Sequence, residues 1–321
     1  MPTGLGEFGR IREFFAPLAG PGGLGLIDDA ALVDCPAGHR LVVTADAIVA
    51  GVHFLPDDPP DLVARKLLRV NLSDIAAMGA RPLYYLLTTA LPTAWDDDWV
   101  ARFAHGLAED QRQFGVALIG GDSVATGGPA VLSLTALGEI ESGKEIRRSG
   151  ALPGDVVWVS GTIGDAFLGL AALRGAYAAL APEQRAYLID RYRLPQPRVA
   201  LGPALAGIAR AMLDVSDGLL ADLGHICDTS RVAARVAAPA LPLSDAAAAS
   251  GEERARLASG GDDYELLFTA PPASTERINQ LSASLALPMT AIGTIEHGSG
   301  VRLVDAEGNE IAVAAAGYRH F

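Results

Sequence analysis

Residues 211–226 read AMLDVSDGLLADLGHI, and this stretch joins a short apolar run to the start of a helix. The first five residues are typical of a buried strand, and the leucines that follow recur with helical spacing. Ser216 suits the N-cap of that helix, where free N–H groups and a positive dipole can bind phosphate. Asp214 and Asp217 can hold an accompanying metal ion, whereas a capping role explains only Ser216. The stretch predicts an α/β unit with a phosphate-binding turn.

Outward from this stretch, helices and strands alternate along the chain, which is typical of α/β or α+β domains. A loop rich in glycine and positive charge suggests a division into two domains at 1–140 and 156–321, with a linker over 141–155. The expected strands are 41–46, 83–91, 116–119, 131–140, 156–160, 211–215, 232–237, 264–269 and 289–295. The expected helices are 8–18, 61–78, 95–114, 164–174, 197–210, 217–227 and 275–286.

Composition narrows the class of protein. The 321 residues are half apolar, and 38 acidic against 25 basic residues give a formal net charge of −13. A negative field of this kind disfavours non-specific binding to nucleic acid and to anionic lipid. Only Cys35 and Cys227 occur, and no signal peptide or membrane span is visible. We expect a cytoplasmic protein without disulfides, nucleic-acid partners or membrane attachment.

Two glycine-rich stretches resemble nucleotide-binding motifs but fail in their context. Residues 138–144 fit GxxxxGK, yet Glu145 follows where a Walker loop requires a hydroxyl for Mg²⁺. Residues 20–25 fit GxGxxG, yet they follow an expected helix instead of a strand. We interpret both stretches as loops.

Aspartates recur at the ends of apolar segments. Each one alone is more often a cap or a turn residue than a ligand, but together they suit Mg²⁺, which binds dispersed carboxylates, water and phosphate. Zinc is not indicated, because the six histidines show no paired spacing. The aspartates concerned are Asp28, Asp29, Asp46, Asp74, Asp122, Asp214, Asp217, Asp262 and Asp263.

Seven blocks of sequence, in order along nearly the whole chain, resemble the thiamine-monophosphate kinase family. The longest, NLSDIAAMGA at 71–80 and the stretch 214–226, are the most specific, together with RYRLPQPR at 191–198. The others are DDAAL at 28–32, GGD at 120–122, RSGALPGD at 148–155 and GGDDYEL at 260–266.

The resemblance implies the α/β (α+β) fold of aminoimidazole ribonucleotide synthetase and selenophosphate synthetase, with two lobes. In that fold the N-terminal sheet forms a homodimer interface, the C-terminal lobe is an α/β sandwich, and ATP with several Mg²⁺ ions lies between the lobes. The implied activity is direct in-line transfer of phosphate from ATP to thiamine monophosphate, without a general base. Carried over by motif, the metal ligands are Asp29, Thr44, Ala45 through its carbonyl, Asp46, Asp74, Asp122, Asp214 and Asp217. The nucleotide contacts are Gly121, Asp122, Arg148, which stabilises charge, and Ser216, and the substrate contacts are His53 and Asp262.

Four positions depart from the family pattern. Ala45 lacks a usual hydroxyl, Ile27 replaces a usual glycine, Asp262 replaces a usual glutamate, and Ala315 stands where an aromatic residue often packs on the substrate. Two alternatives therefore stay open: an ATP-dependent superfamily enzyme with a different small substrate, and a nucleotide or thiamine-phosphate binding protein without turnover.

Overall fold

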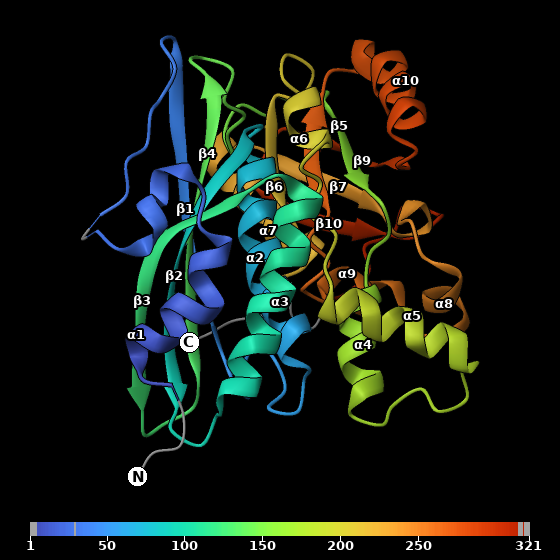
Figure 1. Cartoon of the computed structure of the whole chain (residues 1–321). Coiled ribbons are helices and arrows are strands. Elements are labelled where there is room, and N and C mark those ends of the chain that lie inside the picture. The colour runs from blue at the N-terminus through green and yellow to red at the C-terminus, as the bar shows by residue number, and fades with distance from the viewer. Residues whose placement is uncertain (1–4, 29, 314–316, 318–321) are drawn as a thin grey trace. The chain divides into compact units, whose positions relative to one another are not determined.

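Chain contacts divide the protein into two units, 1–75 with 80–143, and 76–79 with 144–321. The structure is a computed structural model that describes residues 5–28, 30–313 and 317 (Figure 1). The division falls between residues 143 and 144. The domain bounds at 140 and 156, and a linker between them, stay a prediction.

The first unit is built on a four-stranded mixed sheet with the order β1-β4-β2-β3. β4 pairs antiparallel with β1 and with β2, and β2 pairs parallel with β3. Strands β1 and β3 run further than the sequence predicts, because pairing with neighbouring strands continues beyond the predicted bounds. The strands are β1 (His39–Val49), β2 (Arg81–Pro92), β3 (Ala117–Thr126) and β4 (Val131–Glu141).

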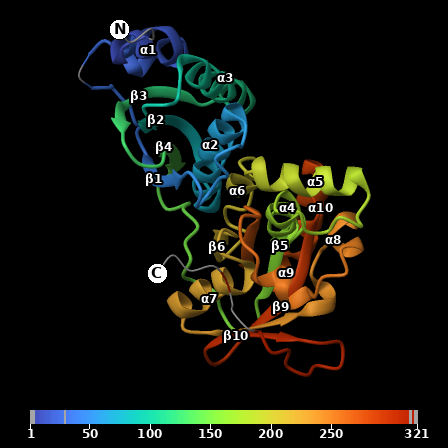
Figure 2. The same cartoon turned by 90° about the horizontal axis from the view of Figure 1, so that it is seen from below.

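Helices α2 (Pro60–Ala77) and α3 (Asp97–Phe114) cover one face of this sheet, as Figure 2 shows. A buried ion pair joins the two helices: Arg69 donates to Asp110 through Nε at 2.6 Å and through Nη2 at 2.9 Å. Arg65 adds a bond from Nε to the same carboxylate at 2.9 Å. Because Arg69 and Asp110 are almost fully buried, neither can exchange its partner for water.

The N-terminal segment packs beside α3 and β3. It consists of α1 (Glu7–Arg10), a π-helical turn (Ile11–Phe15) and two 3₁₀ turns (Ala16–Leu18 and Pro21–Leu26). Arg10 Nε donates to Asp97 Oδ1 at 2.7 Å, and Gln111 Nε2 donates to the carbonyl of Leu18 at 2.9 Å. A hydrogen bond of 2.8 Å from Gly20 N to Leu118 O then ties the segment to the sheet.

The second unit has a six-stranded sheet with the order β10-β7-β9-β5-β8-β6. Only β10 and β7 pair in parallel, and the other neighbours are antiparallel. The sequence predicted every strand except β10, whose short run of alternating residues resembles a loop. The strands are β5 (Val156–Ser160), β6 (Ala211–Asp214), β7 (Ala233–Ala237), β8 (Leu266–Ala270), β9 (Met289–Glu296) and β10 (Gly300–Val304).

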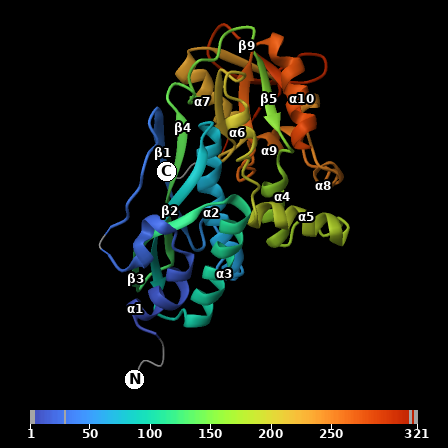
Figure 3. The same ribbon diagram turned by 45° about the horizontal axis from the view of Figure 1, so that its top comes forward.

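Both faces of this sheet are covered, which makes the second unit an α/β sandwich. Val157 and Val159 pack with α7 (Leu219–Ser230) on one face, while Trp158 packs with α10 (Thr275–Leu285) on the other (Figure 3). Helices beside the sheet form a separate apolar cluster around Leu168, Leu188 and Leu257. They are α4 (Asp165–Leu173), α5 (Pro182–Arg193), α8 (Asp245–Ala249) and α9 (Arg254–Ser259).

Three helices in this unit differ from the prediction. The helix expected at 197–210 is reduced to α6 (Leu201–Ala204), because Pro203 has no N–H to bond an earlier turn and Gly207, with a φ of 72°, ends the run. Helices α5 and α9 were not predicted, since α5 is mostly polar and forms no continuous apolar stripe, and α9 has only six residues. In the described part of the chain, no helix is both long enough and apolar enough to cross a membrane.

The Arg69–Asp110 pair generates a stability prediction. Asp110→Asn keeps the shape of the side chain but leaves two arginines facing a neutral group, so we expect a loss of about 3 kcal/mol in the free energy of unfolding. Urea denaturation measures it. The matched control is Asp61→Asn, which affects an exposed pair with Arg102 and should cost less than about 1 kcal/mol. Equal losses in the two variants would contradict the prediction that the buried pair contributes more to stability than the exposed pair.

Candidate functional site

In the first unit, the structure brings three of the predicted metal ligands together. Thr44 and Asp46 are two residues apart on β1, so their side chains share the face that α2 covers. Thr44 Oγ1 donates to Asp74 Oδ2 of α2 at 2.6 Å. Asn71 Oδ1, one helical turn before Asp74, accepts from the backbone N–H of Asp46 at 3.1 Å. Strand β1 and helix α2 therefore present two carboxylates and a hydroxyl at one place.

The charges in this group repel one another. The surrounding protein, and then the negative charge of Asp74, raise the pKa of Asp46 to about 6. Ala45 lies between Thr44 and Asp46 on the strand, so its side chain faces the other side of the sheet. The hydroxyl missing at position 45 consequently removes no donor from the Thr44, Asp46 and Asp74 group.

Asp122 lies on the edge strand β3, apart from this group. The register aligns Asp46, Leu87 and Gly121 across the sheet through β4, so Asp122 faces the opposite side. Three strand spacings separate β1 from β3, which is about 14 Å. Within this unit, Asp122 does not join Asp46 and Asp74 at one metal ion.

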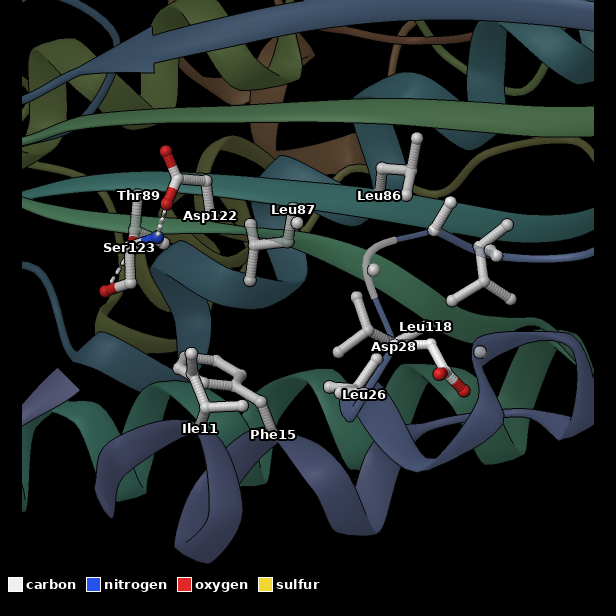
Figure 4. Close-up of a pocket in the computed structure, with 16 residues that line it drawn as sticks. Ile11, Phe15, Leu26, Asp28, Leu86, Leu87, Thr89, Leu118, Asp122 and Ser123 are labelled. Atoms are coloured by element: carbon white, nitrogen blue, oxygen red, sulfur yellow. Dashed lines mark hydrogen bonds between the residues drawn. The ribbon is translucent and has the colours of Figure 1, made fainter. Parts of the chain in front are cut away.

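A pocket of about 170 Å³ lies between the N-terminal segment and strands β2 and β3 (Figure 4). Its walls are mostly apolar, and a hydroxyl pair, Thr89 Oγ1 to Ser123 Oγ at 3.0 Å, marks one end. Gly121 belongs to the lining, and a Cβ there would lie only 1.8 Å from the carbonyl oxygen of Leu87, so no larger residue fits. Asp28 and Asp122 add carboxylates to the hydroxyl and backbone groups of this lining.

Asp28 also lines this pocket and lies at the opposite end from Asp122 in the view of Figure 4. Asp29 lies outside the described residues. Ile27 has an ordinary backbone φ of −112°, so the glycine usual in the family is not required at this position. Positive φ values fall instead at Leu24 and Leu26.

His53 follows β1 in a turn. Its Nδ1 accepts the backbone N–H of Val49 at 3.1 Å, which orients the ring. The buried Lys66 donates to the carbonyl of His53 at 3.1 Å. The turn is thereby held in place, and contact between His53 and substrate stays a prediction.

In the second unit, the turn between β6 and α7 differs from the predicted N-cap. Helix α7 begins at Leu219 with Gly218 as its N-cap, and Ser216 makes no capping bond. Asp222 performs that role from inside the helix: its Oδ2 accepts the N–H groups of residues 216, 217 and 218 at 3.0 to 3.1 Å. The prediction of Ser216 as N-cap was therefore wrong, and three of the N–H groups expected to be free are occupied.

Asp222 is nearly fully buried, and burial raises its pKa to about 7. The N–H of Gly218 opposes this rise, while the charge of Asp217 adds to it. Ligand atoms of Asp217, Asp222 and His225 lie within 4.8 Å of one another. Asp214, the other predicted ligand here, ends β6 and is buried.

The Asp262 segment runs directly beside this turn. The backbone N–H of Asp262 donates to Ser216 O at 2.8 Å, and Tyr264 Oη donates to Asp262 Oδ1 at 3.4 Å. A Cβ on Gly317 would lie 2.8 Å from Asp217 O, which places the chain at residue 317 against the same turn. Ala315 lies outside the described residues.

Arg148 is exposed and joins the far end of α7. Its carbonyl accepts from Thr229 Oγ1 at 3.0 Å and from Ser230 Oγ at 3.5 Å. Twelve helical residues, about 18 Å of rise, separate that end from the Ser216 turn. The backbone of Arg148 is thus distant from Ser216 in this unit, and its role as a nucleotide contact stays a prediction.

Sequence reasoning missed several polar groups around these predicted residues. Asp222 had a usable signal, since it is an aspartate in the first turn of a predicted helix between apolar neighbours. Glu265, Arg191 and Arg198 lay inside quoted blocks but received no role. Their position shows only in three dimensions, because they come from segments about 70 residues apart.

This fold and these carboxylates define a class of protein. The family model described as AIR synthase related protein matches residues 27–140 with its N-terminal domain and residues 153–306 with its C-terminal domain. The chain belongs to this family.

Within the class, the chain belongs to the thiamine-monophosphate kinase family. It is 43% identical to the thiamine-monophosphate kinase of Caulobacter vibrioides over 98% of this chain and 90% of that protein. It is 40% identical to the enzyme of Salmonella typhimurium, with 98% of each chain covered.

Solved structures agree with this membership. Thiamine-monophosphate kinase from Stenotrophomonas maltophilia superposes with a TM-score of 0.80 at 44% identity, covering 87% of this chain and 89% of that one. AaThiL complexed with AMPPCP and TMP gives a TM-score of 0.79 at 32% identity, covering 94% and 97%.

The buried Asp222 generates a pH prediction. Its pKa is higher in the folded chain, about 7, than the ordinary 3.8, so ionisation disfavours folding. Its stabilising contribution is present below pH 3.8 and is lost as the pH rises through about 7. In Asp222→Asn, the urea midpoint with chelator present should therefore fall less between about pH 5 and pH 8 than in wild type. The control, Asp228→Asn on the exposed side of α7, should keep the wild-type slope, and identical slopes in all three proteins would contradict the prediction.

Proposed function

We propose that the protein phosphorylates thiamine monophosphate with ATP and forms thiamine diphosphate and ADP. Family membership over 98% of the chain supports this, as does the relative solved with an ATP analogue and thiamine monophosphate. The structural observation that carries the proposal is the close approach of the Asp46 and Asp74 carboxylates, with the Thr44 hydroxyl beside them. A phosphate-transfer enzyme that brings several anions together needs a site that binds a cation.

The reaction is a single displacement. A phosphate oxygen of thiamine monophosphate forms a bond to the γ-phosphorus of ATP, and the bond from that phosphorus to the bridging oxygen of ADP breaks. The acceptor oxygen is already largely ionised near neutral pH, so no side chain has to remove a proton. The barrier is the approach of two anions, which positive charge and fixed geometry lower.

The residues in the first unit fit Mg²⁺. The Thr44, Asp46 and Asp74 group offers hard oxygen donors, which are the ligands that Mg²⁺ prefers. When bound, Mg²⁺ would neutralise phosphate charge and orient the transferred group. The protein positions these carboxylates before the ion binds. Thr44 donates a hydrogen bond to Asp74, and Asn71 accepts one from the backbone N–H of Asp46.

We also propose that the protein is a homodimer formed through the first sheet. Support comes from large apolar side chains exposed on that sheet, where a monomer gains nothing by exposing them. They are Leu41 and Val43 on β1, Val124 on β3 and Val131 on β4, with exposed fractions of 37% to 59%. A cytoplasmic location stays a prediction.

The activity test uses purified protein with ATP and Mg²⁺, with and without thiamine monophosphate. ADP should form only with thiamine monophosphate and in equal amount to thiamine diphosphate. ADP formation that ignores thiamine monophosphate would indicate a different substrate. An absence of ADP under saturating conditions would favour a binding protein.

Asp74→Asn tests the carboxylate pair. The change is nearly isosteric but removes one charge, so turnover at limiting Mg²⁺ should fall about 100-fold or more while the protein stays folded. The pKa of Asp46, measured by carboxyl NMR, should fall below its wild-type value because the neighbouring charge is gone. Asp98→Asn, an exposed aspartate of α3 in the same unit, is the matched control. Near-normal turnover in Asp74→Asn would reject the metal role.

Lys144→Ala tests the GxxxxGK interpretation. Lys144 is exposed and its motif lacks the required hydroxyl, so the Michaelis constant for ATP should change less than about twofold. A large loss of ATP affinity would restore the Walker-loop interpretation.

A further inference from the structure

One fully buried acidic side chain has no part in the proposed reaction. Glu265 lies just before β8, and its side chain has no exposed surface. Its carboxylate accepts from Arg191 Nη2 at 2.9 Å and from Ser160 Oγ at 2.6 Å. Arg198 binds it with two nitrogens, Nε at 2.6 Å and Nη2. Paired guanidinium contacts of this kind fix a carboxylate in position and direction.

The two arginines are the first and last residues of the RYRLPQPR block, which the proposed reaction leaves unexplained. Removing either one would take away part of the positive charge that compensates the buried Glu265 carboxylate, and uncompensated buried charge is strongly destabilising. The block therefore has a physical reason to carry arginine at both ends: together the pair holds Glu265.

The segment that precedes Glu265 has an unusual backbone. Asp262 and Tyr264 have φ values of 71° and 51°, in the left-handed region that side chains other than glycine rarely adopt. Hydrogen bonds of 2.8 Å from Asp262 N to Ser216 O, and from Tyr264 N to Val215 O, attach the segment to the turn before α7. Such a conformation persists only where the surroundings impose it.

Contacts on the buried side of the 262–264 segment impose this backbone conformation. Asp263 is buried, and its carboxylate accepts from Gly164 N at 2.7 Å and Ala166 N at 3.2 Å. Arg191 Nη2 also reaches the carbonyl of Asp263 at 3.4 Å, so one guanidinium joins Glu265 to the segment itself. With Asp263 held inside, Asp262 and Tyr264 are turned toward the outside, where both are half-buried.

Strand β5 ends in a shape that makes room for the carboxylate. A Cβ on Gly161 would lie 2.2 Å from Glu265 Oε1, and Gly161 has a φ of 57°. The Glu265 carboxylate is therefore enclosed by Ser160, Gly161 and the two arginines.

We propose that Glu265 is a positioning residue that, through Arg191 and Arg198, holds the 262–264 segment so that Asp262 can contact thiamine monophosphate. The proposal rests on the proposed function for the identity of that substrate. Glu265 itself touches no reacting atom. Its effect is carried by the backbone of the segment, which lies against the Ser216 turn.

The test compares two single variants with wild type. Arg198→Lys keeps the charge but loses the two-nitrogen contact, and Glu265→Gln keeps the shape but loses the charge. The control, Arg210→Lys, makes the same change at an ion pair with the buried Asp155 at the other end of β6. If one of the two variants does not fold, the other still decides.

Two readouts separate positioning from stability. The first is hydrogen exchange at the amides of Asp262 and Tyr264, which should become about tenfold faster in both variants and stay unchanged in the control. The second is steady-state kinetics: the Michaelis constant for thiamine monophosphate should rise about tenfold while that for ATP stays within about twofold.

Each outcome decides a separate question. Exchange that is unchanged, or faster exchange with an unchanged Michaelis constant for thiamine monophosphate, would overturn the positioning role. A raised Michaelis constant without faster exchange would also overturn it, because the effect would not pass through the segment. If wild type makes no thiamine diphosphate, the proposed function fails, and the exchange data alone decide whether Glu265 holds the segment.

Discussion

Close approach of negative charges is the constraint on which this structure depends. In the first unit, Asp46 and Asp74 lie near each other, and the Thr44 hydroxyl and the Asn71 amide make hydrogen bonds between β1 and α2 beside them. In the second unit, Asp222 lies near Asp217 and is buried. Folding must tolerate this repulsion before any cation arrives, so rigid strands and helices, instead of loops alone, carry the carboxylates.

The two units meet this constraint in different ways. Around Asp222 the protein uses its own backbone, with three N–H groups directed at one oxygen. Around Glu265 it uses two arginines. At Asp46 the described contacts of the carboxylate include neither device, and burial together with the nearby Asp74 raises its pKa. We interpret Asp222 and Glu265 as structural supports, and the Asp46 and Asp74 pair as the candidate metal site.

Periodicity predicted most of the fold, because apolar runs such as 156–160 and the amphipathic α2 reflect burial directly. It failed where other forces decide: α5 is polar, and the far half of β3 is held by pairing with β2. Resemblance supplied the candidate ligands, and the structure placed Thr44, Asp46 and Asp74 together. The resemblance did not identify Asp222 and Glu265 as supporting residues. These two act through backbone groups and through partners far away in the sequence, which a linear pattern does not show.

Gly161 matters to the structure because it has no side chain. The space that a methyl group would occupy belongs to the carboxylate of Glu265. A substitution there would displace a side chain 104 positions later in the chain and, with it, the loop beside Ser216. Alanine scanning would therefore report Gly161 as sensitive although it contributes no contact of its own. Substitutions at Gly161 therefore offer a way to change ligand preference from the second unit without altering the residues that contact the ligand.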